Sequence, residues 1–237
     1  GYIHGNNVGP RFPKVHFIGS ISDVSTIYVN TKTPGVHLYG VRETGNSRQS
    51  ADLLYPRMIG DRFLVLYVDG RVFGQKFYKI ILNDPSDKMP MAAFLNSTLA
   101  IALNEIFGNV PWGLGAVSVN SRDVNLFPVI PTQYMVCIGH RIFQALKRLW
   151  LRPIRSIFEE LGFALCRQRR CDHPEHPYEH VKPEALTLEQ VRQASPDRYE
   201  LDSVVFDVLG LTEEERLEVY RAVAQLVKDR LVKARSV

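Results

Sequence analysis

The feature that most constrains the fold of this chain is a β-prone stretch with an Asp-Gly dipeptide inside it. Residues 62–68 and 71–82 are rich in Val, Ile, Leu, Phe and Tyr, and Asp69-Gly70 separates the two runs. Asp-Gly supplies the positive backbone angles that a two-residue hairpin turn requires. Because residues 63–68 are all apolar, both faces of that strand must be covered. The sequence therefore predicts a hairpin whose first strand is central in a sheet.

Further strands and one helix are predicted around this hairpin. A helix is expected over residues 91–107, because Pro90 is tolerated in a first helical turn, Gly108 ends the pattern, and apolar positions recur at spacings of three and four. This apolar stripe is expected to pack on the sheet. Short runs rich in Val, Ile, Tyr and Phe predict upstream strands at residues 14–21, 25–30 and 36–41.

Helical patterns replace strand patterns after about residue 130. Helices are predicted over residues 134–149 and 154–161, and Gly162 is expected to end the second one. Thr212 and Glu215 form a capping box at the start of a final amphipathic helix. The apolar face of that helix must pack on the rest of this chain, on another domain or on another copy.

Together these patterns predict an α+β fold in two parts. Residues 1–130 are expected to form a mixed β-sheet domain with a packed helix, and residues 131–237 a helical C-terminal region. A chain of 237 residues with 45% hydrophobic and 23% charged residues has the composition of an ordinary globular protein. No apolar run approaches the roughly 18 residues that a membrane-spanning helix requires, so we expect no membrane partner.

A helix, a flexible loop and a short strand occur in an order that is typical of one protein family. Leu95-Asn96-Ser97 lies in the predicted helix, and a glycine-bracketed loop over residues 108–115 follows it. After a predicted strand at residues 115–120 comes the segment 121–129, with an Asp-Val pair and a Phe-Pro pair. This order resembles the C-terminal part of the target-recognition (specificity) domain of adenine-specific DNA methyltransferases from restriction-modification systems. Three further stretches of this chain resemble the segments that flank this region in the same family: residues 55–65, 77–81 and 201–215.

The resemblance implies sequence-specific recognition of duplex DNA, with methylation performed elsewhere. Amino-methylating enzymes need an Asn/Asp-Pro-Pro-Tyr/Phe loop at the flipped base, and residues 83–86 lack the second proline and the aromatic residue. A glycine-rich cofactor turn is missing too, because Gly113-Leu114-Gly115 follows a predicted helix instead of a strand. We therefore expect no catalytic residue and no cofactor in this chain. Its expected partners are duplex DNA and an upstream methyltransferase domain that uses S-adenosylmethionine.

Positive charge is concentrated in the first and middle portions of the chain, whose net charge is +4. Residues 1–90 carry eleven Lys and Arg against seven Asp and Glu, and residues 141–170 carry eight against two, whereas residues 191–237 carry eight against nine. Phosphate contacts position a protein on DNA, and an arginine can read guanine in the major groove. The candidate DNA-contacting residues are Arg57, Arg62, Arg71, Lys76, Lys79, Asn96, Trp112 and Arg122.

Several of these candidates have a structural alternative. Asn96, like Ser97, can hydrogen-bond to nearby backbone, such as the loop that follows, instead of contacting DNA. Trp112 is either a core residue or an exposed aromatic side chain that stacks on bases or wedges between them. A surface Lys or Arg can also be no more than a solvated charge.

A segment rich in Cys and His raises the question of zinc, which takes thiolate and imidazole ligands. The spacing of these residues is irregular, and two prolines stiffen the segment, so we interpret it as a solvated linker and expect no metal. Three cysteines in a chain of this length form no disulfide framework and fit a reducing cytoplasm. The candidate ligands are Cys166, Cys171, His173, His176 and His180.

Two other classes of function remain open. The protein can be an assembly module whose amphipathic C-terminal helices join the subunits of a larger complex. The other class is a metal-dependent enzyme, and the irregular Cys/His segment is the only feature of the sequence that supports it. A nuclease needs clustered carboxylates around Mg²⁺, and the nearest candidate, Asp69, is better explained by the predicted turn.

Overall fold

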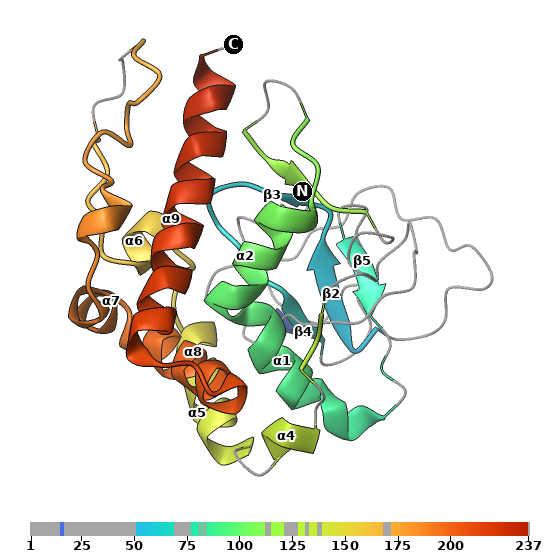
Figure 1. Ribbon diagram of the computed structural model, residues 1–237. Helices are drawn as coiled ribbons and strands as arrows, with labels where there is room; N and C mark the ends of the chain where they lie inside the picture. The colour runs from blue at the N-terminus through green and yellow to red at the C-terminus, as the bar shows by residue number, and fades with distance from the viewer. Residues whose placement is uncertain are drawn as a thin grey trace, which may run out of the picture.

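The structure is a computed structural model in which a small sheet and a set of helices share one core. A sheet lies at one side, helices α1 (Lys88–Asn96) and α2 (Thr98–Phe107) pack beside it, and α9 (Glu213–Arg235) runs alongside α2 (Figure 1). The predicted α+β class is confirmed. The structure describes residues 15–16, 51–68, 77–80, 82, 84–111, 115–120, 128–130, 133–136, 139–167 and 172–236.

The main sheet has the strand order β1-β4-β2-β5. Its pairings are antiparallel among the described strands, whereas the sequence analysis expected a mixed sheet. Because β4 lies inside the sheet, the prediction of a central strand is confirmed. The strands are β1 (Val15–His16), β2 (Leu53–Pro56), β4 (Leu66–Val68) and β5 (Phe77–Ile80).

The predicted hairpin is wrong for the strands that the structure describes. β2 lies between β4 and β5, and Leu53 of β2 is opposite Tyr67 of β4 on one edge and Ile80 of β5 on the other. The physical reason is that β2 is buried throughout, so its backbone groups need partners on both edges. The Asp-Gly turn lies outside the described residues, as do the predicted strands at residues 25–30 and 36–41.

A second, two-stranded element pairs β3 (Met58–Ile59) with β6 (Val117–Ser118). Its hydrogen bonds continue on both sides of β6. Asn109 and Ser118 exchange backbone bonds of 2.8 and 2.7 Å, and the Val119 amide donates to the Arg57 carbonyl at 3.0 Å. We call this element, residues 57–62 with residues 117–120, the β3–β6 ribbon. It joins the end of β2 to the end of the glycine-bracketed loop.

The helix predicted over residues 91–107 is two helices, because the chain is extended at Ser97. The Ser97 hydroxyl accepts from the Ala100 amide at 3.3 Å and donates to the Phe94 carbonyl at 2.6 Å. The Asp202 carboxylate accepts from both the amide and the hydroxyl of Thr98, at 2.7 and 2.6 Å. These bonds satisfy the new helix end. A buried carboxylate distant in sequence therefore stabilises the break.

The C-terminal region contains more helices than the sequence predicted. The predicted helix over residues 134–149 corresponds to α4 and α5, and the helix over residues 154–161 corresponds to the short α6, which Gly162 follows with a φ of 89°. The capping box of Thr212 and Glu215 is confirmed. The remaining elements are η1 (Pro85–Asp87), α4 (Gln133–Val136), α5 (Gly139–Trp150), α6 (Ile157–Glu160), η2 (Pro183–Ala185), α7 (Leu188–Ala194) and α8 (Pro196–Leu209).

One hydrophobic core continues across the boundary that was expected near residue 130. Helix α5 packs on α1 and α8, and α9 packs on α2. The rings of Phe206 and Tyr220 meet edge to face at 5.7 Å between α8 and α9. Among the described residues, no helix combines the length and the apolar composition that crossing a bilayer requires.

Gly108 is required by a close approach between the end of α2 and β6. A Cβ atom at this position would lie 2.1 Å from Val117 Cγ1 and 2.6 Å from the Asn104 carbonyl oxygen. We expect Gly108→Ala to lower the free energy of unfolding by about 1–3 kcal/mol, because the backbone must shift to relieve the overlap. Urea denaturation measures the change.

The matched control is Gly139→Ala, at the first residue of α5. A Cβ atom there meets no other atom within 4 Å, so this variant is expected to be as stable as the parent chain or slightly more stable. Equal unfolding midpoints for the two variants would contradict the close approach at Gly108.

Candidate nucleic-acid interface

The β3–β6 ribbon carries two of the arginines that the sequence analysis selected. Arg57 lies between β2 and β3, and its guanidinium lies 4.7 Å from the centre of the Tyr78 ring on β5. Arg62 follows β3 and is exposed. The carbonyls just before Arg62 are held by buried groups, because Gly60 accepts from Arg230 at 3.0 Å and Asp61 accepts from the Ile157 amide at 2.7 Å. The ribbon therefore presents both arginines from a fixed backbone.

Arg57 and Arg62 differ from the arginines of the helical region in their pairing. In the described part of the chain, no carboxylate lies within ion-pair distance of either side chain. The helical region instead contains the ion pairs Arg141–Asp207, Arg148–Glu200, Arg152–Asp197, Arg198–Glu160, Arg216–Asp207, Arg221–Glu218 and Arg230–Glu105. Ion pairs thus accompany much of the positive charge in the helical region, whereas Arg57 and Arg62 form no ion pair among the described residues.

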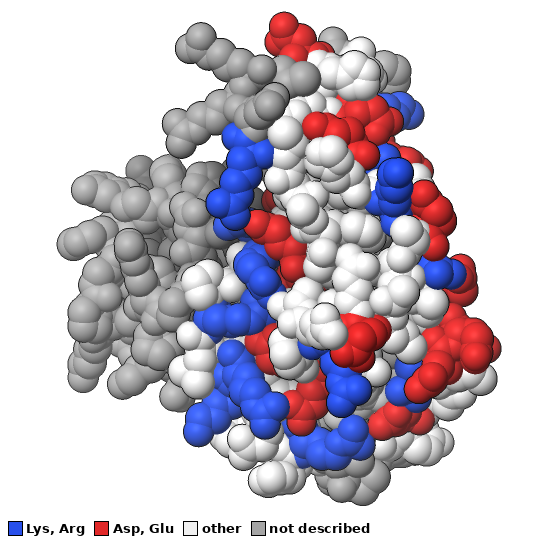
Figure 2. Space-filling view, turned by 90° about the vertical axis from the view of Figure 1, so that its left-hand side faces the viewer, with Lys and Arg blue, Asp and Glu red and all other residues white. Residues whose placement is uncertain are grey.

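The side of the molecule that bears α6 and α7 shows the same compensation. Figure 2 shows Lys and Arg side chains interleaved with Asp and Glu side chains over this face, with much uncharged surface between them. A mixed face of this kind produces no extended positive potential. The excess of cations over residues 141–170 therefore does not by itself make a surface for a polyanion.

The glycine-bracketed loop is held at both ends. Gly108 approaches Val117 at the start of the loop, and Gly115 at its end has a φ of 58°. The Gly115 carbonyl accepts a hydrogen bond from Arg230, and a Cβ at Gly115 would lie 3.3 Å from Leu231 and from Ala234. The last turns of α9 therefore pack directly on the loop end. This anchoring lies beside the ribbon that carries Arg57 and Arg62.

Asn96, selected as a candidate for DNA contact, is a buried residue whose side chain bonds to the protein backbone. Its side chain is 1% exposed. The amide oxygen accepts from the Val65 amide at 3.0 Å, and the amide nitrogen donates to the Val65 and Ala92 carbonyls at 3.1 and 3.3 Å. Asn96 thus pairs with Val65 as a neighbouring strand would. The alternative that Asn96 bonds to backbone groups is confirmed. Its main backbone partner is Val65, on the segment before β4, and not the loop that follows the helix.

The other selected residues are less completely described. Lys79 lies in β5 opposite Leu54, and its side chain lies outside the described residues. The remaining candidates fall wholly outside the described residues, and these are Arg71, Lys76, Trp112 and Arg122.

A buried ionic network between α6 and the start of α8 was missed by the sequence analysis. Arg198 donates to the Asn96 carbonyl at 3.0 Å and to Glu160 at 3.1 Å. Glu160 also accepts two bonds of 2.6 Å from Arg152, which in turn donates to Asp197 at 2.5 and 2.9 Å. The sequence gives little signal for it, since Glu160 is the second of two adjacent glutamates and only its apolar neighbours Phe158 and Leu161 hint at burial.

The network sets the ionisation of its members. Burial would raise the pKa of Glu160, but the hydrogen bonds from Arg152 and the charges of Arg198 and Arg152 lower that pKa to about 2. Burial raises the pKa of Asp202, against the opposing effects of Arg198 and Thr98. Burial and the nearby Asp202 raise the pKa of Tyr220 well above its ordinary value. These three groups are closed to solvent, so their shifted pKa values reflect burial and internal partners and do not mark an accessible catalytic site.

The described part of the Cys/His segment is packed at His176, which is buried, whereas His173 and His180 are exposed, so its interpretation as a solvated linker is wrong at His176. Val181 is fully buried, and the Lys228 ammonium on α9 donates to its carbonyl at 3.2 Å. Cys166 and His176 come together with Glu179, a residue that the sequence analysis did not select. Among the described residues, His173 and His180 do not join this group, and Cys171 lies outside the described residues.

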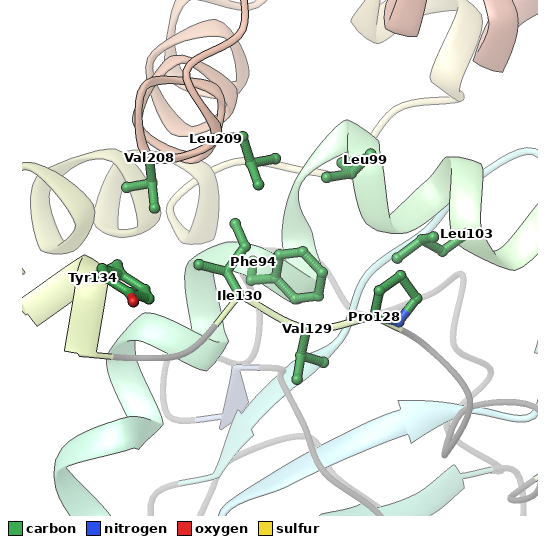
Figure 3. Close-up of a pocket in the computed structure, with 9 residues that line it drawn as sticks. All are labelled: Phe94, Leu99, Leu103, Pro128, Val129, Ile130, Tyr134, Val208 and Leu209. Atoms are coloured by element: carbon green, nitrogen blue, oxygen red, sulfur yellow. The ribbon is translucent and has the colours of Figure 1, made fainter.

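An apolar groove lies between α1, α2, α4 and the end of α8 (Figure 3). Its volume is about 420 Å³. Val129 and Tyr134 at this groove are 50% and 58% exposed. Its lining residues are Phe94, Leu99, Leu103, Pro128, Val129, Ile130, Tyr134, Val208 and Leu209. Nothing in the sequence pattern predicted it, because the four elements meet only in the folded chain.

Comparison with known proteins identifies no relative of this chain, since no family model, no curated protein and no solved structure matches it.

Proposed function

We propose that this chain is a DNA-recognition module that places duplex DNA against the β3–β6 ribbon. The observation that carries the proposal is the pair of arginines on this ribbon, Arg57 and Arg62, which have no carboxylate partner among the described residues. The motif order around Leu95-Asn96-Ser97 supports the same function.

The shape of the ribbon suits this role. A two-stranded ribbon fits the major groove of B-DNA, which is about 12 Å wide. Arg57 and the 42% exposed Met58 lie at the start of β3, and Arg62 lies just beyond its end. Because the flanking backbone is already held by Arg230 and Ile157, little conformational freedom is lost on binding.

In this proposal, base modification belongs to another part of the parent protein. That part is an adenine-specific methyltransferase domain that uses S-adenosylmethionine and receives the flipped adenine. The chain itself supplies sequence specificity in a restriction-modification enzyme of the cytoplasm. Asp202 and Tyr220, whose pKa values are raised, are both buried, and we assign neither a catalytic step.

The test is the salt-dependent binding of duplex DNA. We expect the variant with Arg57→Glu and Arg62→Glu to bind at least about tenfold more weakly than the parent chain, because two favourable charges become repulsive. The dependence of log K on log salt should also become shallower by about 2 if both residues contact phosphates. Fluorescence anisotropy of a labelled duplex at several KCl concentrations measures both quantities.

The matched control reverses two exposed lysines of the helical region, Lys147→Glu and Lys182→Glu. It carries the same change in net charge and is expected to keep the parent affinity within about twofold. Lys228 and Arg230 are unsuitable controls, because Lys228 pairs with Glu175 and Arg230 is buried. The proposal fails if the parent chain binds no duplex at low salt, or if both variants lose affinity equally.

A second candidate function is docking within a larger assembly, and the apolar groove favours it. Further apolar side chains are exposed on and just after the end of α2. Their exposed fractions are 63% for Ile106, 37% for Phe107 and 48% for Val110. Size-exclusion chromatography with light scattering distinguishes the candidates. A stable dimer that does not bind DNA supports assembly, and a monomer that binds duplex DNA supports recognition.

A further inference from the structure

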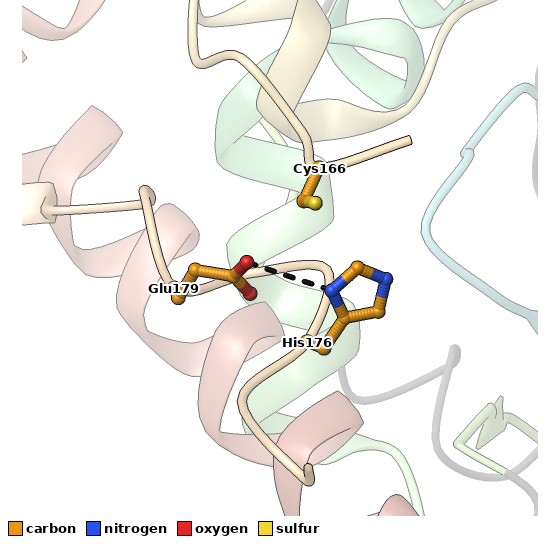
Figure 4. Close-up of side chains that lie close together, drawn as sticks. All are labelled: Cys166, His176 and Glu179. Atoms are coloured by element: carbon orange, nitrogen blue, oxygen red, sulfur yellow. Dashed lines mark ion pairs between the residues drawn. The ribbon is translucent and has the colours of Figure 1, made fainter. Parts of the chain in front are cut away.

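Three potential metal ligands converge in the segment between α6 and η2. The sulfur of Cys166, a ring nitrogen of His176 and a carboxylate oxygen of Glu179 lie within 4.8 Å of one another. The His176 Nδ1 atom lies 3.5 Å from Glu179 Oε1, and the three side chains face a common space (Figure 4). Ligand atoms on opposite ends of a tetrahedral edge around zinc are roughly 3.3–3.7 Å apart. The observed separation between nitrogen and oxygen already matches such an edge.

The backbone holds these ligands in place. The Cys166 amide donates to the Pro177 carbonyl at 3.1 Å, which ties the cysteine to the turn that carries the other two ligands. The His176 amide donates to the His173 carbonyl at 3.0 Å, and the His176 ring is almost completely buried. Little ordering therefore remains to be done when a cation binds.

The ligand turn is also tied to the rest of the fold. Tyr178, between two of the ligands, packs its ring 5.3 Å from that of Phe158 on α6. The Lys228 ammonium on α9 lies 3.2 Å from the Glu175 carboxylate and donates to the Val181 carbonyl. The turn thus rests on two helices of the core.

We propose that Cys166, His176 and Glu179 form a binding site for a divalent transition-metal ion of the zinc type. Thiolate and imidazole ligands select zinc over the hard cations Mg²⁺ and Ca²⁺, which prefer oxygen. The Cys166 thiol releases its proton to solvent when the sulfur–metal bond forms, and water occupies the fourth position. A metal ion here cross-links the chain after α6 to the turn before η2.

The test measures binding of the metal alone to chelator-washed chain that carries no histidine tag. Titration with zinc chloride in a calorimeter is expected to show one ion per chain, and magnesium chloride is expected to show none. Cobalt substitution should give a sulfur-to-metal charge-transfer band in the near ultraviolet. The thermal unfolding midpoint should rise with zinc concentration, because the ion binds only the folded site.

Variants assign the ligands. Cys166→Ser should abolish the charge-transfer band and weaken zinc binding at least about 100-fold, and Glu179→Gln should weaken it about tenfold. Glu179 is exposed, so its variant is expected to keep the fold, which circular dichroism verifies. His180→Ala, an exposed histidine nearby, is the matched control and should bind zinc as the parent chain does. Absence of zinc binding by the folded parent chain overturns the proposal, as does equal binding in all three variants.

Discussion

Glu160→Gln is expected to lower the free energy of unfolding by about 3–5 kcal/mol, the usual cost of removing one partner of a buried ion pair. The Glu160 side chain is 1% exposed and accepts hydrogen bonds from Arg152 and Arg198. Glutamine keeps the volume but removes the charge, and the buried Arg198 is then left without its carboxylate. Because Arg198 also bonds to the Asn96 carbonyl, the loss reaches the junction of α1 and α2.

Urea denaturation of both chains at pH 7 measures this change. The matched control is Glu218→Gln, whose side chain is 69% exposed and pairs with Arg221 on the surface of α9. Surface ion pairs contribute about 0–1 kcal/mol, so the control should lose no more than that. If the two variants are equally stable, the network at Glu160 does not hold the helical region together.

The effect of Glu160→Gln should depend on pH. The pKa of Glu160 is lowered from 4.5 to about 2 in the folded chain, a difference that corresponds to about 3 kcal/mol. This stabilisation is present above pH 4.5 and is lost as the pH falls towards 2. The stability gap between the parent chain and Glu160→Gln should therefore shrink between pH 5 and pH 3. A constant gap would contradict the lowered pKa.

Asp202 changes the stability of the parent chain with pH in the direction opposite to Glu160. Its pKa is raised in the folded state, so its contribution to stability is present below its ordinary pKa and is lost as the pH rises through the raised value. The comparison with Glu160→Gln cancels this contribution, because Asp202 is present in both chains.

Arg230→Met is expected to destabilise the chain by about 3–5 kcal/mol. The Arg230 guanidinium donates to Glu105 at 2.9 and 2.8 Å, to the Gly60 carbonyl at 3.0 Å and to the Gly115 carbonyl. Without it, the Glu105 carboxylate, whose side chain is 4% exposed, remains buried and unpaired. The same change removes the bonds from α9 to the β3–β6 ribbon at Gly60 and to the end of the glycine-bracketed loop at Gly115.

A double variant separates the charge effect from a packing effect. Arg230→Met combined with Glu105→Met removes both charges and is expected to recover at least about 2 kcal/mol of the loss. Thermal and urea unfolding of the two single variants and the double variant complete the cycle. Simple addition of the two single losses would show that the pair does not act as a unit.

The sequence predicted the features that depend on neighbouring residues. The capping box at Thr212, the end of α2 at Gly108 and the helix end before Gly162 each follow from chemistry within a few residues. The central position of β4 followed from its apolar character on both faces. The hairpin prediction failed because β2, which precedes both runs, inserts between them, and a local turn signal carries no information about that insertion.

Tertiary structure decided the role of each polar group at the candidate site. Asn96 bonds to a residue 31 positions away, Arg198 reaches the Asn96 carbonyl across 102 positions, and Arg230 reaches Glu105 across 125. Periodicity in a sequence reports which face of an element is apolar, but it cannot report which distant carboxylate a cation meets. The sequence alone determined that Arg57 and Arg62 are cations beside a strand. Only the folded chain decided that these two lack described carboxylate partners while Arg198 and Arg230 are buried in ion pairs, because pairing depends on distance in space.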